Sequence, residues 1–367
     1  MNTIKINREA LLAPLYAVSG IIERRHTLPI LSNVLLERDG TDITIVATDI
    51  EIQISAKAVC DNPGEAKAIT VAARKLLDIL RALPEQSEVT LALQEKKLQV
   101  KAAKSRFNLQ TLPAEDFPKL SLAEGASNKM ILPQKVLKDL FLSVQYAMAQ
   151  QDIRYYLNGL LLVSAGDKLI VVATDGHRLA LASAEHKIEG MQEVILPRKT
   201  ILELSKLMSD SDEPVEVELS PTQARFSFGG IVLISKLVDG KFPDYTRVIP
   251  TTHNKKLLLN RIVLLQALQR AAILTNEKFK GVRWLLVDGS LKIICSNNEQ
   301  EEAQEELDVD YAGEALDIGF NVNYLQDVLN NLDCDEVECA LGDANSSALI
   351  TVPGNDNFKY VVMPMRI

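Results

Sequence analysis

The chain has 367 residues, of which 47% are apolar and 24% charged, as in ordinary globular domains. It has no run of about 18 apolar residues that could span a membrane and no basic-then-apolar start typical of a secretory signal, and its four scattered cysteines favour a reducing, cytoplasmic compartment. With a net charge of −9, any binding to a polyanion would have to rely on a local cationic surface.

A helical pattern of apolar residues occurs three times along the chain, beginning near Asn7, Pro133 and Asn260. A second helical pattern follows each of these, and its three copies start 125 residues apart, at 71–83, 196–208 and 321–332. Equal spacing at several landmarks indicates internal repetition. We therefore expect three similar domains, at residues 1–125, 126–250 and 251–367.

Local signals place the ends of these helices. Asn7 and Asn260 are good N-cap residues, and Pro133 and Pro197 suit the first helical turn. Pro84 should end the second helix of the first repeat.

Short segments with alternating apolar and polar residues lie between the helices. In the first repeat they occur at 28–37, 42–46, 51–57, 88–93 and 97–102. A period of two is typical of half-buried strands, and Asp-Gly and Asn-Pro-Gly pairs mark the turns. The pattern predicts an α+β fold of antiparallel sheets, with two helices per repeat packed on one face.

Acidic residues are concentrated in the last third of the chain. Residues 251–367 have a net charge of −8, whereas residues 1–120 have a net charge of +1. A carboxylate-rich segment is usually a solvated face. The alternative is an acidic edge, at 299–310, that binds a basic edge supplied by Lys96, Lys97, Lys101, Lys104 and Arg106.

The six expected helices are basic although the rest of the chain is acidic. They carry five acidic residues, Glu9, Asp78, Asp139, Glu203 and Asp327, against eleven basic ones, Arg8, Arg74, Lys75, Arg81, Lys135, Lys138, Arg198, Lys199, Lys206, Arg261 and Arg270. Exposed basic helix faces often serve solubility alone. Their recurrence in successive repeats favours a surface that faces a polyanion, although the last helix is neutral to acidic.

Three separated motifs carry a resemblance to a known family: Thr-Asp-Gly-His-Arg-Leu-Ala at 174–180, Lys-Phe-Pro-Asp-Tyr at 241–245 and Tyr-Val-Val-Met-Pro-Met-Arg-Ile at 360–367. Together with the three repeats, they make the chain resemble the bacterial DNA polymerase III beta subunit, the sliding clamp, over its full length. The resemblance implies the clamp fold, in which two subunits join head to tail into a homodimeric ring of six domains. Sheets form the outside, and helices line a hole around duplex DNA.

The resemblance also implies a non-catalytic processivity factor with no cofactor or metal. Its expected partners are double-stranded DNA, the polymerase III alpha subunit, the clamp loader, and other polymerases and repair proteins with clamp-binding motifs, and no membrane. Residues implied to lie near DNA are Arg25, Gln151, Tyr155 and Tyr156, to which we add Arg198 and Lys199 from the basic helix stripe. The alternative for Tyr155 and Tyr156 is a strand pair with one ring buried.

The size of the hole can be checked by simple geometry. Twelve helices with axes ~8–10 Å apart leave an opening of ~22–28 Å once side chains are allowed for, which admits a duplex roughly 20 Å across with a layer of water. One chain alone would leave only ~6–9 Å. The geometry therefore favours a dimer that holds DNA by enclosure rather than by tight phosphate contacts.

The seam between subunits should pair an edge of the first repeat with an edge of the third. The resemblance places Lys75, Phe107 and Leu109 on one side and Ile273 and Leu274 on the other, although the last two could simply end a helix. Lys97, Lys104 and Arg106 would face Glu299, Glu301 and Glu305. Apolar contacts would supply most of the stability, and the charges would set the orientation.

The resemblance further implies a groove between the second and third repeats that receives short apolar peptides of partner proteins. An apolar C-terminus, where polar residues are usual, agrees with this, and methionines suit a pocket with several ligands. The matching residues are Leu157, Thr174, Gly176, His177, Arg178, Leu179, Pro243, Arg247, Val248, Phe279, Asn321, Tyr324, Ser347, Val361, Val362, Met363, Pro364, Met365 and Arg366.

Two other classes of protein fit the sequence less well. An enzyme is disfavoured because the sequence has no Gly-rich phosphate loop, no His-Glu-x-x-His and no Gly-x-Ser-x-Gly. Cys334 and Cys339 lack the second pair of ligands that zinc would need, and His177 beside Asp175 suits a pocket wall better than acid–base chemistry. A repeat-built scaffold without nucleic acid is opposed only by the charge of the helices.

Overall fold

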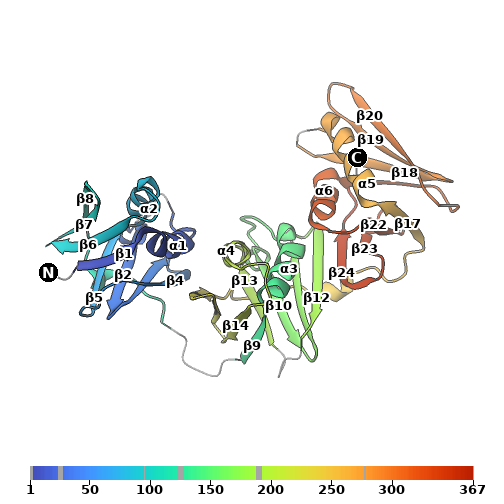
Figure 1. Ribbon diagram of the computed structural model, residues 1–367. Coiled ribbons are helices and arrows are strands. Elements are labelled where there is room, and N and C mark those ends of the chain that lie inside the picture. Colours follow the sequence, from blue (N-terminus) through green and yellow to red (C-terminus); the bar gives the residue numbers. More distant parts are fainter. Residues whose placement is uncertain are drawn as a thin grey trace. The chain divides into compact units, whose positions relative to one another are not determined.

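The structure is a computed structural model that describes residues 3–23, 28–94, 96–121, 128–186, 192–276 and 278–366 (Figure 1). In this part of the chain each repeat contributes eight strands and two α-helices. The expected helix pairs are confirmed as α1 (Arg8–Ser19) and α2 (Ala73–Ala82), α3 (Gln134–Val144) and α4 (Arg198–Leu207), and α5 (Arg261–Ala271) and α6 (Val322–Asn331). None of the described helices is long and apolar enough to cross a membrane.

Every described strand pair is antiparallel, as predicted. Two sheets have four strands, in the orders β1 (Thr3–Asn7), β6 (Glu88–Gln94), β7 (Lys97–Ala102), β8 (Ser105–Gln110) and β20 (Glu302–Asp308), β19 (Ser290–Ser296), β18 (Gly281–Val287), β21 (Leu316–Asn321).

Two further sheets have eight strands each. The first runs β5 (Lys67–Ala72), β2 (Asn33–Asp39), β3 (Asp42–Thr48), β4 (Ile52–Val59), β16 (Ile231–Lys236), β15 (Gln223–Phe228), β14 (Pro214–Leu219), β9 (Asn128–Pro133). The second runs β13 (Gln192–Pro197), β10 (Gly159–Ala165), β11 (Lys168–Thr174), β12 (Arg178–Glu185), β24 (Asn355–Val362), β23 (Ala348–Val352), β22 (Glu336–Leu341), β17 (Lys255–Asn260).

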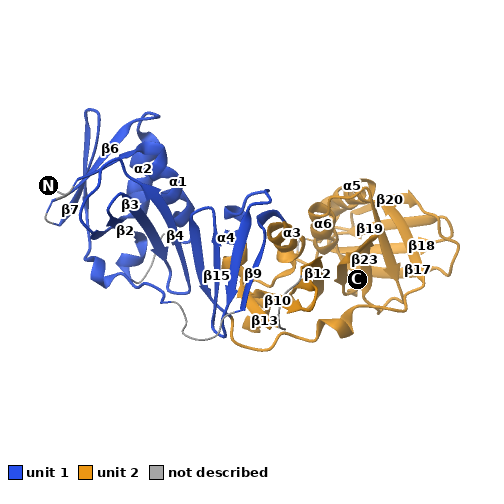
Figure 2. Cartoon of the chain, turned by 60° about the horizontal axis from the view of Figure 1, so that its bottom comes forward, with its two compact units in different colours: residues 1–135, 202–237 blue, residues 136–201, 238–367 orange. Residues whose placement is uncertain are grey.

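The chain forms two compact units, residues 1–135 with 202–237 and residues 136–201 with 238–367 (Figure 2). Each unit contains one eight-stranded sheet that joins two successive repeats, because β4 pairs with β16 and β12 pairs with β24. The fourth strand of a repeat thus pairs with the eighth strand of the next. The expected division at 125/126 lies outside the described residues, and the one at 250/251 lies before β17; both boundaries stay predictions.

Two local expectations were wrong. Residues 29–32, expected to begin a strand, form a 3₁₀ turn, η1 (Pro29–Ser32), because proline fixes the backbone there and the ladder starts only at Asn33. Pro133 and Pro197 are not in the first helical turn but end β9 and β13, where they still pair across the ladder. Each therefore precedes its helix by one residue.

The first and second helices of a repeat are tied together at their ends. Arg8 Nε donates to Leu80 O at 2.6 Å, and Arg261 Nε donates to Cys334 O at 2.6 Å and Nη1 to Leu329 O at 2.9 Å. These carbonyls lie at or just beyond the ends of α2 and α6, where the helix leaves acceptors unpaired and favours cations. Arg261, expected on a solvent-facing cationic stripe, is therefore half-buried instead, and so is Arg8.

Candidate functional site

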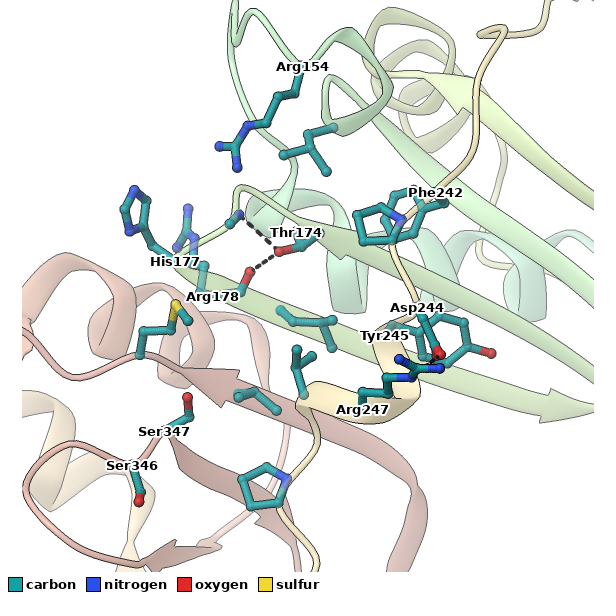
Figure 3. Close-up of a pocket in the computed structure, with 18 of the residues that line it drawn as sticks. Arg154, Thr174, His177, Arg178, Phe242, Asp244, Tyr245, Arg247, Ser346 and Ser347 are labelled. Carbon is teal, nitrogen blue, oxygen red and sulfur yellow. Dashed lines mark hydrogen bonds and ion pairs between the residues drawn. The ribbon is translucent and has the colours of Figure 1, made fainter.

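A cavity of about 490 Å³ lies entirely within the second unit (Figure 3). Its wall consists of the β11–β12 hairpin, the 3₁₀ turn η4 (Tyr155–Leu157), the segment around the 3₁₀ turn η5 (Tyr245–Val248), and the end of β24. It brings together twelve residues of the expected peptide pocket: Leu157, Thr174, Gly176, His177, Arg178, Leu179, Pro243, Arg247, Val248, Ser347, Val361 and Met363.

Eight further residues line the cavity that were not assigned to the pocket from the sequence: Arg154, Tyr156, Phe242, Asp244, Tyr245, Pro250, His253 and Ser346. Three of them belong to the motif at 241–245 and could have been included on that signal. Seven expected residues do not line the cavity: Phe279, Asn321, Tyr324, Val362, Pro364, Met365 and Arg366. Of these, Asn321 caps α6 through Asn323 N, and Tyr324 lies against Arg178.

The β11–β12 hairpin is fixed by hydrogen bonds from its own side chains. Thr174 Oγ1 donates to Arg178 O at 2.6 Å and accepts from Gly176 N at 3.1 Å, as Figure 3 shows. Asp175 Oδ1 accepts from His177 N at 2.9 Å and from Arg178 N at 3.0 Å. Gly176 has a φ of +88°, and a Cβ there would also meet the Arg154 guanidinium, so this position favours glycine.

Arg178 forms the polar floor beside the cavity, with a side chain only 10% exposed. Its Nη1 contacts Asp327 Oδ2 on α6 at 2.5 Å, its Nε contacts Asp175 Oδ2 at 3.1 Å, and its Nη2 donates to Tyr146 O at 2.6 Å. The guanidinium also lies over the Tyr324 ring, 4.4 Å from its centroid.

The surroundings keep Arg178 charged. Burial works to lower its pKa, but Tyr360, Asp327 and Asp175 outweigh that effect, and the pKa of the guanidinium is raised. One side chain thus joins the hairpin of the second repeat to the last helix of the third.

The C-terminal residues complete the wall. Val361 pairs with Leu179 in the ladder, and Met363 N donates to His177 O at 2.8 Å, just beyond the end of the strand. Val361 is buried, whereas the Met363 side chain is 47% exposed at the cavity. Met365 N donates to Gly319 O at 2.8 Å, so the tail continues along β21. As far as Met365, the tail is therefore hydrogen-bonded to the fold rather than frayed.

The residues expected near DNA are divided between several places. Gln151, with a φ of +55°, is exposed in the segment before η4, and Tyr155, 57% exposed, is the first residue of η4. Tyr156 packs edge to face against Tyr155 and lines the cavity. The alternative of a strand pair for these two tyrosines is wrong, because both lie in the 3₁₀ turn.

Three remaining residues of this group were expected from the loop at 24–26 and the second helix of the second repeat. Arg25 lies outside the described residues. Arg198 is half-buried and donates Nη1 to Met148 O at 3.2 Å, and burial followed by the charge of Arg178 lowers its pKa. Lys199 is half-buried.

Arg154 is held by its own loop. Its Nε and Nη2 donate to the two carboxylate oxygens of Asp152 at 3.0 and 2.8 Å, and Nη2 reaches Asp175 O at 3.1 Å. The hydrogen bond from Arg154 lowers the pKa of Asp152 to about 2. These contacts hold the Arg154 guanidinium beside the cavity, which it lines.

Two sheet edges carry the residues expected at the subunit seam. β8 ends one four-stranded sheet and carries the exposed Arg106, the half-buried Phe107 and the buried Leu109. Lys104 is exposed in the turn just before β8. Lys75 is exposed on α2.

β20 ends the other four-stranded sheet, close to the 3₁₀ turn η6 (Ala272–Leu274). Ile273 is 78% exposed and Leu274 is half-buried there. Glu299 is exposed, Glu301 accepts from Asn297 Nδ2, and Glu305 is paired within the chain to Arg270, with Nε at 2.9 Å.

Comparison with known proteins identifies the family to which this three-repeat architecture belongs. Family models of the N-terminal, central and C-terminal domains of the DNA polymerase III beta subunit match residues 2–121, 131–244 and 246–366. The chain belongs to the DNA polymerase III beta subunit family. Its function is that of a DNA sliding clamp, a non-catalytic processivity subunit.

The similarity to individual clamps extends over the whole chain. The beta sliding clamp of Pseudomonas putida is 49% identical over 364 residues, 99% of both chains, and that of Escherichia coli K12 is 45% identical over the same share. A crystal structure of the Pseudomonas aeruginosa sliding clamp matches with a TM-score of 0.96 at 47% identity, covering 100% of both chains. A solved structure of the Caulobacter crescentus polymerase III beta subunit gives a TM-score of 0.93 at 38% identity, also covering 100% of both chains. The three-domain clamp fold expected from the sequence is thereby confirmed.

Replacing Arg178 should destabilise the joint between hairpin and last helix. Arg178→Met leaves the Asp327 and Asp175 carboxylates without their cation, and we expect a loss of ~2–4 kcal/mol in the free energy of unfolding. Urea unfolding, followed by circular dichroism and by the fluorescence of Trp284, measures this. Arg154→Met is the matched control: its side chain is 44% exposed, so the loss should stay below ~1 kcal/mol. Equal losses in the two variants would contradict the role assigned to Arg178.

Proposed function

We propose that two copies of this chain close head to tail into a ring that encircles duplex DNA in the cytoplasm, and that the cavity holds peptides of the polymerase III alpha subunit, the clamp loader and other partner proteins. Each copy would supply domains 1–125, 126–250 and 251–367. The full-length similarity to three-domain clamps carries the proposal.

The charge of the helices supports binding by enclosure. Arg8, Arg261 and Arg198 are half-buried and bind carbonyls of their own chain. The exposed basic residues of the helices are Arg74, Lys75, Arg81, Lys135, Lys206 and Arg270, of which the last two are ion-paired to Glu203 and Glu305. All but Arg270 belong to the first two repeats. A helix-lined hole with so few exposed cations attracts phosphates weakly, which permits sliding, and Arg25, Gln151, Tyr155, Tyr156, Arg198 and Lys199 stay the proposed residues nearest DNA.

Strand pairing supports the head-to-tail seam. Within each unit the fourth strand of one repeat pairs with the eighth strand of the next. β20 is the fourth strand of the third repeat and β8 is the eighth of the first, and both end their sheets within the described chain. A second copy would continue the rule by pairing β20 with β8, and the acidic β20 would meet the basic Lys104 and Arg106.

The cavity supports peptide binding by its shape and lining. Leu157, Leu179 and Val361 provide buried apolar walls, and Met363 gives a flexible, polarisable rim. The hydroxyl side chains of Ser346 and Ser347 also belong to the lining, as Figure 3 shows. Two clamps of known structure, from Pseudomonas aeruginosa and Bartonella birtlesii, are bound to griselimycin, and we infer that this compound can serve as a competitor here.

Enclosure is tested by the topology of the DNA. The protein, loaded onto nicked circular DNA and washed at moderate salt, should remain bound, because no free end lets the ring slide off. Cutting the circle once with a restriction enzyme should release it, as measured by gel filtration of labelled protein. Equal retention on circular and linear DNA would contradict binding by enclosure.

The seam is tested by the mass in solution. The wild-type chain should have about twice 40.6 kDa by light scattering, and Leu274→Asp should give monomers because a charge would be buried at the seam. Leu258→Asp is the control, since Leu258 is 54% exposed on β17, away from the proposed seam. A Leu274→Asp variant that stays dimeric would remove this residue from the seam.

The pocket is tested by shortening the tail. Deletion of residues 363–367 removes Met363 from the rim and its hydrogen bond to His177 O. Binding of a fluorescent peptide from the polymerase alpha subunit should be lost by anisotropy, and griselimycin should displace the peptide from the full-length chain. The dimer should persist, because the tail is remote in sequence from both proposed seam edges. Unchanged peptide affinity would place the binding site elsewhere.

A further inference from the structure

An acidic residue occupies the same position in the second helix of all three repeats. It is the sixth residue of α2, α4 and α6, namely Asp78, Glu203 and Asp327. The sheets confirm that these three helices are aligned correctly. Each helix starts directly after a strand, and the last residue of that strand pairs with the first residue of the neighbouring strand, which is Asn33, Gly159 or Gly281. The fourth residues, Leu76, Ile201 and Leu325, are all buried.

Two of these carboxylates lie where one repeat contacts the preceding repeat, at the end of that preceding repeat's first helix. In the first unit Glu203 is 5% exposed and packs so closely over Gly20, just after α1, that a Cβ on residue 20 would overlap it. In the second unit Asp327 holds Arg178, which in turn donates to Tyr146 O, just after α3. The acidic position therefore belongs to a junction between repeats.

The third copy of this junction is incomplete within one chain. Asp78 is exposed, and in the described part of the chain no hydrogen bond or ion pair joins its carboxylate, not even to Arg74 or Arg81 on the same helix. On the other side, Ile273 follows α5 as Gly20 and Tyr146 follow α1 and α3, and it is 78% exposed. Under the proposed function, on which this inference rests, a second copy brings the two halves together.

On one side of this third junction, the charge is opposite to that at the corresponding position of the second unit's junction. Arg178 N and Glu301 N both donate to the side-chain oxygen of the first loop residue, Asp175 or Asn297, at 3.0 Å. Glu301 is therefore the counterpart of Arg178, and a carboxylate stands where the inner junction has a guanidinium. Lys75, the third residue of α2, is the counterpart of Tyr324, which lies over Arg178.

We propose that Asp78 of one copy faces Glu301 of its partner across the seam, and that this like-charge contact weakens the seam while Lys75 strengthens it. The inner junctions keep their carboxylates buried or paired, so they hold the chain together. The seam repeats the same contact with one charge of the wrong sign. The like-charge contact therefore lowers the free energy needed to open the seam.

The proposal predicts that removing a charge tightens the dimer. Asp78→Asn should lower the dimer dissociation constant by ~2–5-fold at low salt, the range expected for one exposed charge pair, and by less at high salt because ions screen the contact. Lys75→Gln should raise the constant. Both are measured by dilution of labelled dimers, with circular dichroism to confirm folding. Asp139→Asn, an exposed acid on α3 outside any junction, is the control and should change nothing.

A double variant tests whether Glu301 is the residue that faces Asp78. In a Glu301→Gln chain, the gain from Asp78→Asn should disappear, because the repelling charge is already gone. The inference would be overturned if Asp78→Asn tightened the Glu301→Gln dimer as much as the wild-type dimer. It would also be overturned if Asp78→Asn weakened the dimer, or left its dissociation constant unchanged at low salt. None of these results would contradict the ring itself. A wild-type chain that is monomeric would overturn the proposed ring and this inference together.

Discussion

The pairing of strand edges between repeats is the constraint on which the rest of the structure depends. A sheet edge leaves backbone groups unpaired and must be covered or joined to another edge. Here β4 joins β16 and β12 joins β24, so each eight-stranded sheet spans two repeats. β8 and β20 each pair on one side only, and among the described strands none covers their outer edges. These two open edges are the physical basis for proposing a second copy.

The cavity is a product of one of these joints. Thr48, Asp49 and Ile50 of the first repeat form the same hydrogen-bonded hairpin as Thr174, Asp175 and Gly176, and Ile50 even shares the positive φ, at +80°. The counterpart of Leu179 is Gln53, and its side chain accepts from Leu120 N. The segment that follows the first repeat is therefore hydrogen-bonded to the sheet where β4 joins β16. Where β12 joins β24, the equivalent position is the apolar Leu179, and the wall stays open to a ligand.

Charge has different uses inside the chain and at its surface. Arg8, Arg178 and Arg261 bind carbonyls and carboxylates of their own chain, which fixes helix ends and the joint of the second unit. The cations left exposed on the helices are few, and a net charge of −9 keeps the remaining surface acidic. That balance suits a protein that holds DNA by closure more than by contact.

The amino-acid sequence by itself determined the repeat, because apolar spacing and turn residues act locally and recur at a fixed interval. It also determined the antiparallel strands, the six helices and, through the motifs near 174–180 and 241–245, most of the cavity wall. Only the tertiary structure decided which charged side chains are paired within the chain. Arg178 and Asp327 lie 149 residues apart in the sequence, and Arg261 donates to carbonyls 68 and 73 residues away. Such contacts depend on which helix ends the folded sheets bring together, and no local pattern of residues records that.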